Sequence, residues 1–245
     1  MQNFYAPTES FSENTVTLSG DEYFHATRSC RVRPGEIIAV TDGVGKRVEA
    51  RITDIDAEIL HAEITKDVSG IGELDTHISL ALALIKPANF ELAAEKCTEL
   101  GVRRILPLIS ANTNVRPDRL KVARLEKITH AAAKQSGRSF LPEIAEPIPL
   151  LDLYSHVNGE VIVASTHAEQ DMEKALKSLS DEHDLTIVIG PEGDLTDEEY
   201  DVLATAGAKS VSLGGLTLRS ETAAIAAMSL AAACGAKGWK ERLFG

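Results

Sequence analysis

The chain has 245 residues, of which 44% are hydrophobic and 25% are charged, and its formal net charge at pH 7 is −12. A chain of this length can bury a sizeable core, as one large domain or two unequal ones, and its acidic excess argues against a uniformly basic nucleic-acid-binding protein. No apolar run reaches the length of a membrane span, and the first 20 residues lack the pattern of a signal peptide, so we expect a soluble, cytoplasmic protein.

The first 70 residues or so have the pattern of β-structure. Short apolar stretches predict strands at residues 36–40, 48–52 and 59–64. Turn signals at 33–35 and 42–45 separate the strands. A linker containing two glycines, 68–72, comes next. The sequence therefore predicts a small β-barrel domain over residues 1–72, with its boundary near 68–76.

Beyond this linker, apolar strands alternate with helices. The predicted strands are 78–85, 104–109, 161–164, 185–189 and 210–213. The predicted helices are 89–100, 117–137, 172–179, 196–206 and 221–233. Pro117 suits a first helical turn, and Thr196 and Glu199 have the spacing of a capping box. The alternation, with nearly continuous apolar strands, indicates an α/β domain over residues 73–245 with a largely parallel sheet.

Cysteine and histidine spacing gives no sign of a metal site. Cys30, Cys97 and Cys234 are isolated and form no Cys-x-x-Cys pair, so we expect neither a zinc site nor a disulfide framework. The seven histidines also lack the spacing of metal ligands. We therefore expect a protein that works without a bound metal.

Positive charge is concentrated in one part of the chain. Residues 101–140 hold nine Lys and Arg against two Asp and Glu, whereas residues 141–200 have the opposite bias. A chain polarised in this way can present one basic face to a polyanion such as RNA while staying acidic elsewhere. A solvated helix face explains the same pattern, so charge alone leaves both interpretations open.

Two loops at strand ends have the composition of ligand-binding segments. They are residues 189–194 and 213–223, each between a predicted strand and a predicted helix. Ligands of open α/β sheets bind beyond the carboxyl ends of the strands, where glycines let the backbone approach them closely. Neither loop has the glycine spacing of a dinucleotide or nucleoside triphosphate site. A pair of ordinary turns is the alternative.

Four motifs occur in order along residues 77–233. They are Lys96-x-x-Glu99-Leu100-Gly101-Val102, Gln135-Ser136-x-Arg138, Gly190-Pro191-Glu192-Gly193, and Leu213-Gly214 followed by Leu218-Arg219-Ser220-Glu221-Thr222-Ala223. Together they resemble the signatures of the 16S ribosomal RNA uridine-N3 methyltransferase family (RsmE-type) of the SPOUT superfamily. The order of the four makes the resemblance specific, whereas any one motif alone would not. The N-terminal domain resembles the family only loosely.

The resemblance implies an N-terminal PUA-like β-barrel that binds RNA and a C-terminal SPOUT domain with a trefoil knot. It also implies S-adenosylmethionine as cofactor and a homodimer that acts on 16S ribosomal RNA of the small subunit. The implied cofactor-binding residues are Ser165, Thr166, Gly190, Glu192, Gly193, Leu213, Gly214, Leu218 and Ala223. Asp194 departs from the glycine expected at its position, and Leu195 stands where an aromatic or aliphatic residue is expected.

Arg219 and Glu221 are the candidate catalytic residues. N3 of uridine carries a hydrogen, so it becomes nucleophilic mainly as the anion. Arg219 has no evident folding role in the sequence and suits RNA phosphate or the charge developing on the base. An ion pair with Glu221 or Glu192 is the alternative. Glu221 begins a helix, where exposed amides stabilise a carboxylate, so a helix cap and a catalytic base are both open.

Seven residues are candidate RNA contacts: Arg28, Arg31, Arg33, Arg116, Arg119, Gln135 and Arg138. The first three form a cluster without acidic residues in the predicted barrel, which suits phosphate binding, although a solvated loop would look the same. The other four lie in the basic stretch between residues 101 and 140.

Three functions remain open on this reading. The first is methyl transfer from S-adenosylmethionine to N3 of a uridine in 16S ribosomal RNA. The second is ribose 2′-O-methylation of another RNA by a related SPOUT enzyme. The third is a catalytically silent RNA-binding assembly factor that kept the fold, although the intact motifs at 190–193 and 219–223 argue against it.

Overall fold

The computed structural model describes residues 1–178 and 184–235. The chain divides into two compact units, each with its own core. The first unit contains Met1–Glu73 and also His130–Leu141, whereas the second contains Leu74–Thr129 and the chain from Pro142 onward. The segment 130–141 thus lies with the first unit although it is far from it in the sequence.

The first unit is built on a curled sheet whose described part has five strands in the order β1-β3-β4-β5-β2. The strands are β1 (Gln2–Tyr5), β2 (Thr15–Leu18), β3 (Ile37–Thr41), β4 (Arg47–Ile55) and β5 (Leu60–Asp67). β1 pairs with β3 in parallel and the other pairs are antiparallel. Two register shifts interrupt the pairing of β4 with β5, and such irregularities bend a sheet. The expected barrel is in this structure a curled half-barrel.

A short helical segment packs against this sheet. It consists of α1 (Gly20–Phe24), which continues as a π-helix over His25–Cys30. Tyr23 and Ala26 of this segment belong to the core of the first unit, together with Phe4, Val16 and other strand residues. The sequence patterns predicted β3, β4 and β5 but missed β1, β2 and this helical segment.

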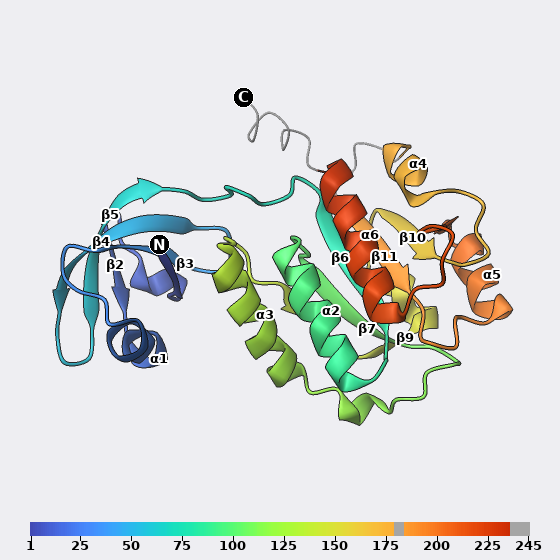
Figure 1. Cartoon of the computed structure of the whole chain (residues 1–245), viewed down its shortest axis with the longest axis horizontal. Helices are drawn as coiled ribbons and strands as arrows, with labels where there is room; N and C mark the ends of the chain where they lie inside the picture. Colours follow the sequence, from blue (N-terminus) through green and yellow to red (C-terminus); the bar gives the residue numbers. More distant parts are fainter. Residues whose placement is uncertain (179–183, 236–245) are drawn as a thin grey trace. The chain divides into compact units, whose positions relative to one another are not determined.

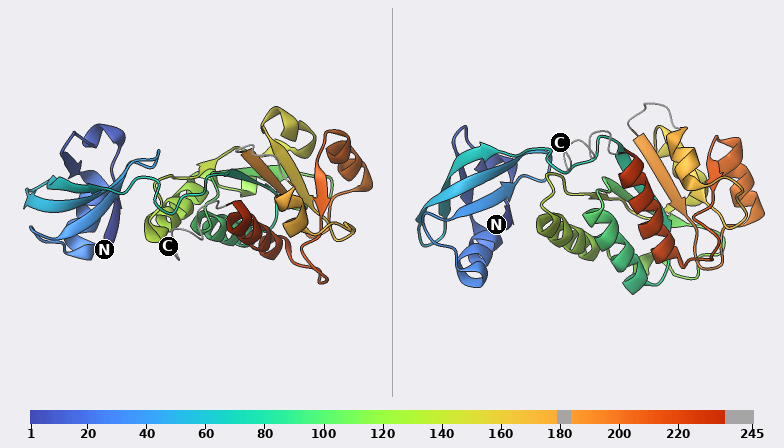
Figure 2. Two further views of the ribbon diagram at one scale, coloured as in Figure 1. Left: turned by 90° about the horizontal axis from the view of Figure 1, so that it is seen from above. Right: turned by 45° about the horizontal axis from the view of Figure 1, so that its top comes forward.

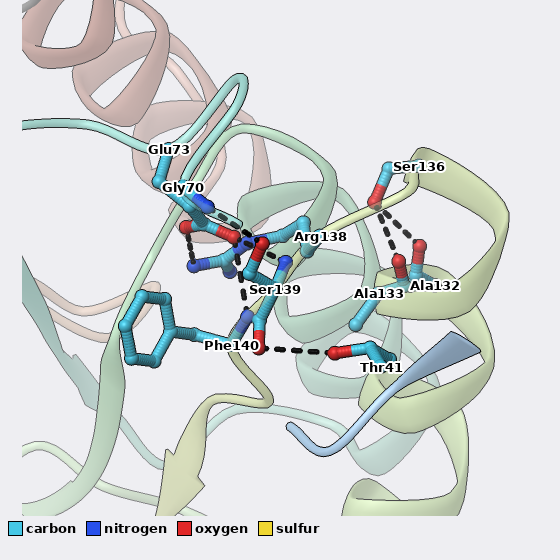
Figure 3. Close-up of polar contacts among 9 residues, drawn as sticks. All are labelled: Thr41, Gly70, Glu73, Ala132, Ala133, Ser136, Arg138, Ser139 and Phe140. Carbon is cyan, nitrogen blue, oxygen red and sulfur yellow. Dashed lines mark hydrogen bonds and ion pairs between the residues drawn. The ribbon is translucent and has the colours of Figure 1, made fainter. Parts of the chain in front are cut away.

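A buried network of hydrogen bonds joins the segment 138–141 to the rest of the first unit (Figure 3). The carboxylate of Glu73 accepts hydrogen bonds from Nη2 of Arg138 at 2.9 Å and from the amides of Ser139 and Phe140 at 2.7 and 3.2 Å. Thr41 of β3 donates its hydroxyl to the carbonyl of Ser139 at 3.1 Å. These bonds hold the returning segment against the end of β3.

The second unit has a parallel sheet whose described strands follow the order β12-β10-β11-β6-β7-β8, with β9 beside β7. The strands are β6 (His77–Ala83), β7 (Arg104–Ile109), β8 (Glu143–Ile144), β9 (Ile148–Pro149), β10 (Glu160–Ala164), β11 (Asp184–Ile189) and β12 (Lys209–Val211). Its helices are α2 (Pro87–Glu99), α4 (Met172–Lys177), α5 (Asp197–Thr205) and α6 (Ser220–Gly235), with 3₁₀ segments at Pro117–Arg119 and Leu150–Ser155. A further helix, α3 (Val122–Ser136), begins in this unit, and its residues from His130 onward belong to the first unit. The predicted α/β fold with a largely parallel sheet is confirmed.

Helices cover both faces of this sheet. α2 and α6 lie side by side over one face (Figures 1 and 2), and their side chains share a core with Ile78, Leu80 and Leu82 of β6. Ala81 of the same strand faces the other way, toward a second cluster that includes Leu203 of α5. Because successive strand residues enter opposite cores, both faces are buried, which explains the nearly continuous apolar strands.

Two helix starts illustrate what the sequence predicted well and badly. The side chain of Thr196 accepts a hydrogen bond from the amide of Glu199 and the side chain of Glu199 accepts one from the amide of Thr196, so the predicted capping box is confirmed. The helix expected from Pro117 begins only at Val122, because Pro117–Arg119 forms a 3₁₀ turn and Leu120 is extended. The last residue of the helix expected at 172–179 lies outside the described residues.

In the described ranges, 1–178 and 184–235, no helix is long and apolar enough to cross a membrane. The same ranges contain no cluster of three or more His, Cys, Asp or Glu side chains that could hold a metal ion.

Candidate cofactor-binding site

A cavity of about 350 Å³ opens in the second unit, where the loops that follow β10, β11 and β12 converge. These three strands are neighbours in the sheet. The cavity therefore lies beyond the carboxyl ends of parallel strands, the usual ligand site of open α/β sheets, and its volume lies within the range of small-molecule sites. The cavity is lined by Ala164, Ser165, Thr166, Ile189, Gly190, Pro191, Glu192, Asp194, Ser212, Leu213, Gly214, Leu216, Thr217, Leu218, Arg219, Ser220 and Ala223.

The structure brings together eight of the nine residues that the sequence predicted to bind a cofactor. Among the described lining residues are Ser165, Thr166, Gly190, Glu192, Leu213, Gly214, Leu218 and Ala223. Gly193 is not on the wall. Its carbonyl instead accepts a hydrogen bond from Nδ2 of Asn112 at 3.1 Å. Asp194 does line the cavity, and only its place in a strand-end loop pointed to it in the sequence.

Two glycines give this cavity its shape. Gly214 has φ +126°, a conformation that side chains disfavour, and apart from its two chain neighbours no described residue lies within 4 Å of the point where its Cβ would stand. At Gly190, a Cβ would lie 3.3 Å from Oδ1 of Asp194 and from Cγ of Leu195. A side chain at either position would strain or crowd the wall of the cavity.

The loop after β11 accommodates Asp194, which departs from the glycine of the expected motif, and Leu195 beside it. Asp194 has φ +61°, in the left-handed region that glycine enters freely and aspartate more readily than most residues. Its Oδ1 accepts a hydrogen bond from the amide of Leu195 at 2.8 Å and from the hydroxyl of Tyr200 at 2.7 Å. Leu195 is buried in the core beneath the loop. Asp194 and Leu195 thus stabilise the loop from within.

Arg219 and Glu221 have different environments. Arg219 lines the cavity and is exposed, and it forms no ion pair with Glu192, Glu221 or another carboxylate in the part of the chain that the structure describes. The ion pair considered as its alternative role is therefore absent there. Glu221 is buried in the first turn of α6, is not part of the cavity wall, and its Oε2 has no hydrogen-bond partner among the described residues.

The arginine cluster of the first unit is exposed. Arg28, Arg31 and Arg33 all face solvent, and the guanidinium of Arg28 lies 4.4 Å from the centre of the Phe24 ring. Arg31 ends the π-helix with φ +55°. Three exposed guanidinium groups within six residues can contact phosphate without displacing an ion pair to any described residue.

The other candidate RNA contacts are less uniform. Arg116 and Arg119 are exposed, and Arg116 pairs with Asp118 at 3.5 Å. Gln135 is also exposed and lines an open groove of the first unit. Arg138 differs from the prediction, because its side chain is only 6% exposed and pairs with the buried carboxylate of Glu73 at 2.9 Å. In this structure Arg138 helps to hold the segment 138–141 in place.

Comparison with known proteins agrees with this arrangement. The RNA methyltransferase domain family matches residues 72–232, and the RNA methyltransferase PUA domain family matches residues 18–65. A ribosomal RNA small subunit methyltransferase E from Synechocystis is 32% identical over 225 residues, which cover 90% of this chain and 74% of the relative. The chain belongs to the ribosomal RNA small subunit methyltransferase E family. A member from Rickettsia conorii is 31% identical over 89% of this chain and 90% of its own length.

Solved structures that are similar to this chain include complexes with S-adenosylmethionine. The family member from Neisseria gonorrhoeae, bound to S-adenosylmethionine, is 30% identical, has a TM-score of 0.82, and is matched over 94% of this chain and 95% of its own. A methyltransferase from Legionella pneumophila in complex with the same cofactor is 28% identical with a TM-score of 0.79, over 95% and 97% of the two chains.

Proposed function

We propose that this chain transfers the methyl group of S-adenosylmethionine to N3 of a uridine in 16S ribosomal RNA of the small ribosomal subunit. The observation that carries the proposal is the cavity itself, since the residues that family motifs assign to the cofactor converge on one wall from three separate loops. Ordinary turns would not have to meet in this way.

The cavity has the features that this cofactor requires. Its volume of about 350 Å³ suits a small ligand, and Gly190 and Gly214 leave backbone groups accessible on its wall. When bound, S-adenosylmethionine supplies a methyl group already activated as a sulfonium. We assign the eight predicted residues on the cavity wall to binding, and Gly193 to shaping the loop beside it.

The chain must also make uridine N3 nucleophilic. Arg219 lines the cavity with no carboxylate paired to it among the described residues, so its charge is available to stabilise an anion forming on the base. Glu221 remains the candidate proton acceptor, although its buried Oε2 would have to become accessible. As a first-turn residue of α6 it is also placed to interact with the helix amides.

RNA binding is assigned to both units. In the first, the PUA-like domain over residues 1–72 contributes Arg28, Arg31 and Arg33, and Gln135 joins this unit from α3. In the second, the SPOUT domain over 73–245 contributes Arg116 and Arg119. Phosphate contacts of this kind fix the position of an RNA, and the cavity then selects the base.

We further propose a homodimer and a trefoil knot that contains the loops 189–194 and 213–223, as in SPOUT enzymes. Support for the dimer comes from α6, where the small residues Thr222, Ala226, Ser229 and Ala233 recur at helical spacing on a face that is not fully buried. Sedimentation at micromolar concentration tests the dimer, because a fully active monomer would contradict it.

Nucleoside mass spectrometry of ribosomal RNA from cells with and without the gene tests the proposed reaction. Loss of N3-methyluridine from 16S ribosomal RNA, restored by the wild-type gene, is the expected result. Loss of a ribose methyl group instead would select the 2′-O-methyltransferase. An unchanged set of modified nucleosides would select the silent assembly factor.

The cofactor assignment predicts that Gly214→Val weakens binding of S-adenosylmethionine. Because φ at this position is +126°, we expect the strained side chain to disturb the loop and to raise the dissociation constant about 10-fold or more. Gly207→Val is the matched control, since Gly207 also has a positive φ and open space around it but does not line the cavity. Calorimetry should show a loss of affinity for S-adenosylmethionine in Gly214→Val only. Equal affinities in the two variants would contradict the assignment of the cavity to this cofactor.

The RNA assignment predicts a second result. The double charge reversal Arg31→Glu and Arg33→Glu should lower affinity for 16S ribosomal RNA about 10-fold or more and make its salt dependence shallower, because fewer counterions are released. Binding of S-adenosylmethionine should not change. Reversal of two other exposed cations of this unit, Arg51 and Lys66, is the control. If both double variants lose affinity for the RNA by the same factor, the effect comes from net charge, and the arginine cluster has no specific role.

A further inference from the structure

A carboxylate on the cavity wall is held in place by a side chain behind it. Asp194 lines the cavity, and its Oδ1 accepts hydrogen bonds from the hydroxyl of Tyr200 and the amide of Leu195 at 2.7 and 2.8 Å. Oδ2 of Asp194 forms no hydrogen bond or ion pair within the described part of the chain. One oxygen is thus fixed by the protein while the carboxylate as a whole forms part of the wall.

Tyr200 fixes this carboxylate as a neutral donor. Burial raises the pKa of the Tyr200 phenol above its ordinary value, so the hydroxyl keeps its proton at neutral pH. The same hydroxyl lies 3.4 Å from the carbonyl of Ala164, at the end of β10. Tyr200 therefore connects the loops after β10 and β11, which form two sides of the cavity, without neutralising the charge of Asp194.

The backbone of this loop is also anchored from a third side. Nδ2 of Asn112 donates to the carbonyls of Gly193 and Asp194 at 3.1 and 3.0 Å. Oε1 of Glu199, a member of the capping box of α5, accepts a hydrogen bond from the amide of Ala111 at 2.8 Å. A loop with this many anchors does not need the carboxylate charge of Asp194 for its shape, since an amide oxygen could accept the same two bonds.

We propose that Asp194 is a specificity-determining residue that favours the positively charged methyl donor over the neutral product. The proposal rests on the function proposed above. S-adenosylmethionine carries a sulfonium charge, whereas S-adenosylhomocysteine, which remains after the methyl group leaves, is a neutral thioether at that sulfur. Asp194 and Glu192 put two carboxylates on the wall against the single guanidinium of Arg219.

The size of the cavity makes this charge effective. The Debye screening length is about 10 Å at 0.1 M salt. Any charge on a ligand in a cavity of about 350 Å³ lies closer to the wall than this length, so its interaction with Asp194 is only partly screened. Asp194 is half-buried, whereas Glu192 is exposed, so water screens Asp194 less. Asp194 therefore helps to exchange product for fresh methyl donor after each turnover.

Asp194→Asn tests the charge without changing the shape, because asparagine tolerates the left-handed conformation and keeps an oxygen for Tyr200 and Leu195. We expect the dissociation constant of S-adenosylmethionine to rise about 5-fold or more, as expected for one partly screened charge at short range, and that of S-adenosylhomocysteine to change less than about 2-fold. Calorimetry with each ligand measures both values. Asp201→Asn, which removes an exposed carboxylate of α5 outside the cavity, should change neither.

Kinetics supply an independent readout. Since the sulfur loses its positive charge during transfer, the carboxylate stabilises the bound donor more than the transition state. Asp194→Asn should therefore raise KM for S-adenosylmethionine without lowering kcat. Tyr200→Phe keeps the charge of Asp194 but removes the hydrogen bond that holds its carboxylate in place. This variant should raise the dissociation constants of both ligands by similar factors.

If Asp194→Asn weakens the binding of the two ligands by the same factor, or changes the binding of neither, the proposal is overturned and Asp194 serves only the structure of the loop. That failure is distinct from failure of the proposed function, in which the wild-type chain would bind neither ligand.

Discussion

Arg219→Ala should lower the single-turnover rate of RNA methylation by about 10²-fold or more, as is typical when one electrostatic stabiliser of a transition state is lost. Uridine N3 loses its proton on the way to methylation, and negative charge spreads to the neighbouring oxygens of the base. Arg219 is exposed on the cavity wall and no carboxylate is paired with it among the described residues, so its charge is free to stabilise this anion.

The measurement is methyl transfer at saturating cofactor and RNA, so that binding defects do not contribute. Arg219→Lys keeps the charge and should recover part of the rate. Arg124→Ala is the matched control, because Arg124 is exposed and pairs with Glu91 outside the cavity. A wild-type rate in Arg219→Ala would remove the electrostatic role, and a loss of cofactor affinity alone would reassign Arg219 to binding.

The pH dependence of the same assay separates the two roles open to Glu221. If Glu221 takes the N3 proton, Glu221→Gln is slow near neutral pH and recovers as solvent hydroxide ionises the uridine. If Glu221 only stabilises the start of α6, the variant loses thermal stability while its pH–rate profile keeps the wild-type shape. The burial of Oε2 away from the cavity wall favours the second outcome.

The sequence predicted the second unit better than the first, for a physical reason. Strands such as β6 and β11 are buried on both faces, so their apolar runs are unmistakable, and the capping box of Thr196 and Glu199 is a local signal. β1 and β2 have only four residues each, and only one or two of their side chains are fully buried. Elements this short carry too little pattern to be recognised.

The site was predictable where local sequence determines it and not where distant contacts do. Glycine-rich strand-end loops pointed to the cavity, because close backbone approach needs glycine. The buried pairing of Arg138 could not be predicted, because a charge in a basic stretch gives no sign of Glu73, its partner 65 residues earlier in the chain. The hydrogen bond from Tyr200 to Asp194 joins residues close in the sequence, but it depends on how α5 packs beside its own N-terminal loop.

Glu73→Ala should destabilise the full chain by about 3 kcal/mol or more, because it leaves a buried guanidinium without its counter-charge. The side chains of Glu73 and Arg138 are only 7% and 6% exposed. The substitution also removes the acceptor for the amides of Ser139 and Phe140, which no side-chain change can delete (Figure 3). Loss of these two hydrogen bonds adds to the cost.

The order of the variants tests this explanation. Arg138→Met should cost less than Glu73→Ala, because the two amides still donate to the Glu73 carboxylate after the guanidinium is gone. Asp118→Ala, which breaks the exposed pair with Arg116, should change stability little, since exposed ion pairs contribute little. Urea unfolding of the full chain followed by circular dichroism measures all three. If Glu73→Ala unfolds at the same urea concentration as Asp118→Ala, the buried network does not hold the segment 138–141 to the first unit.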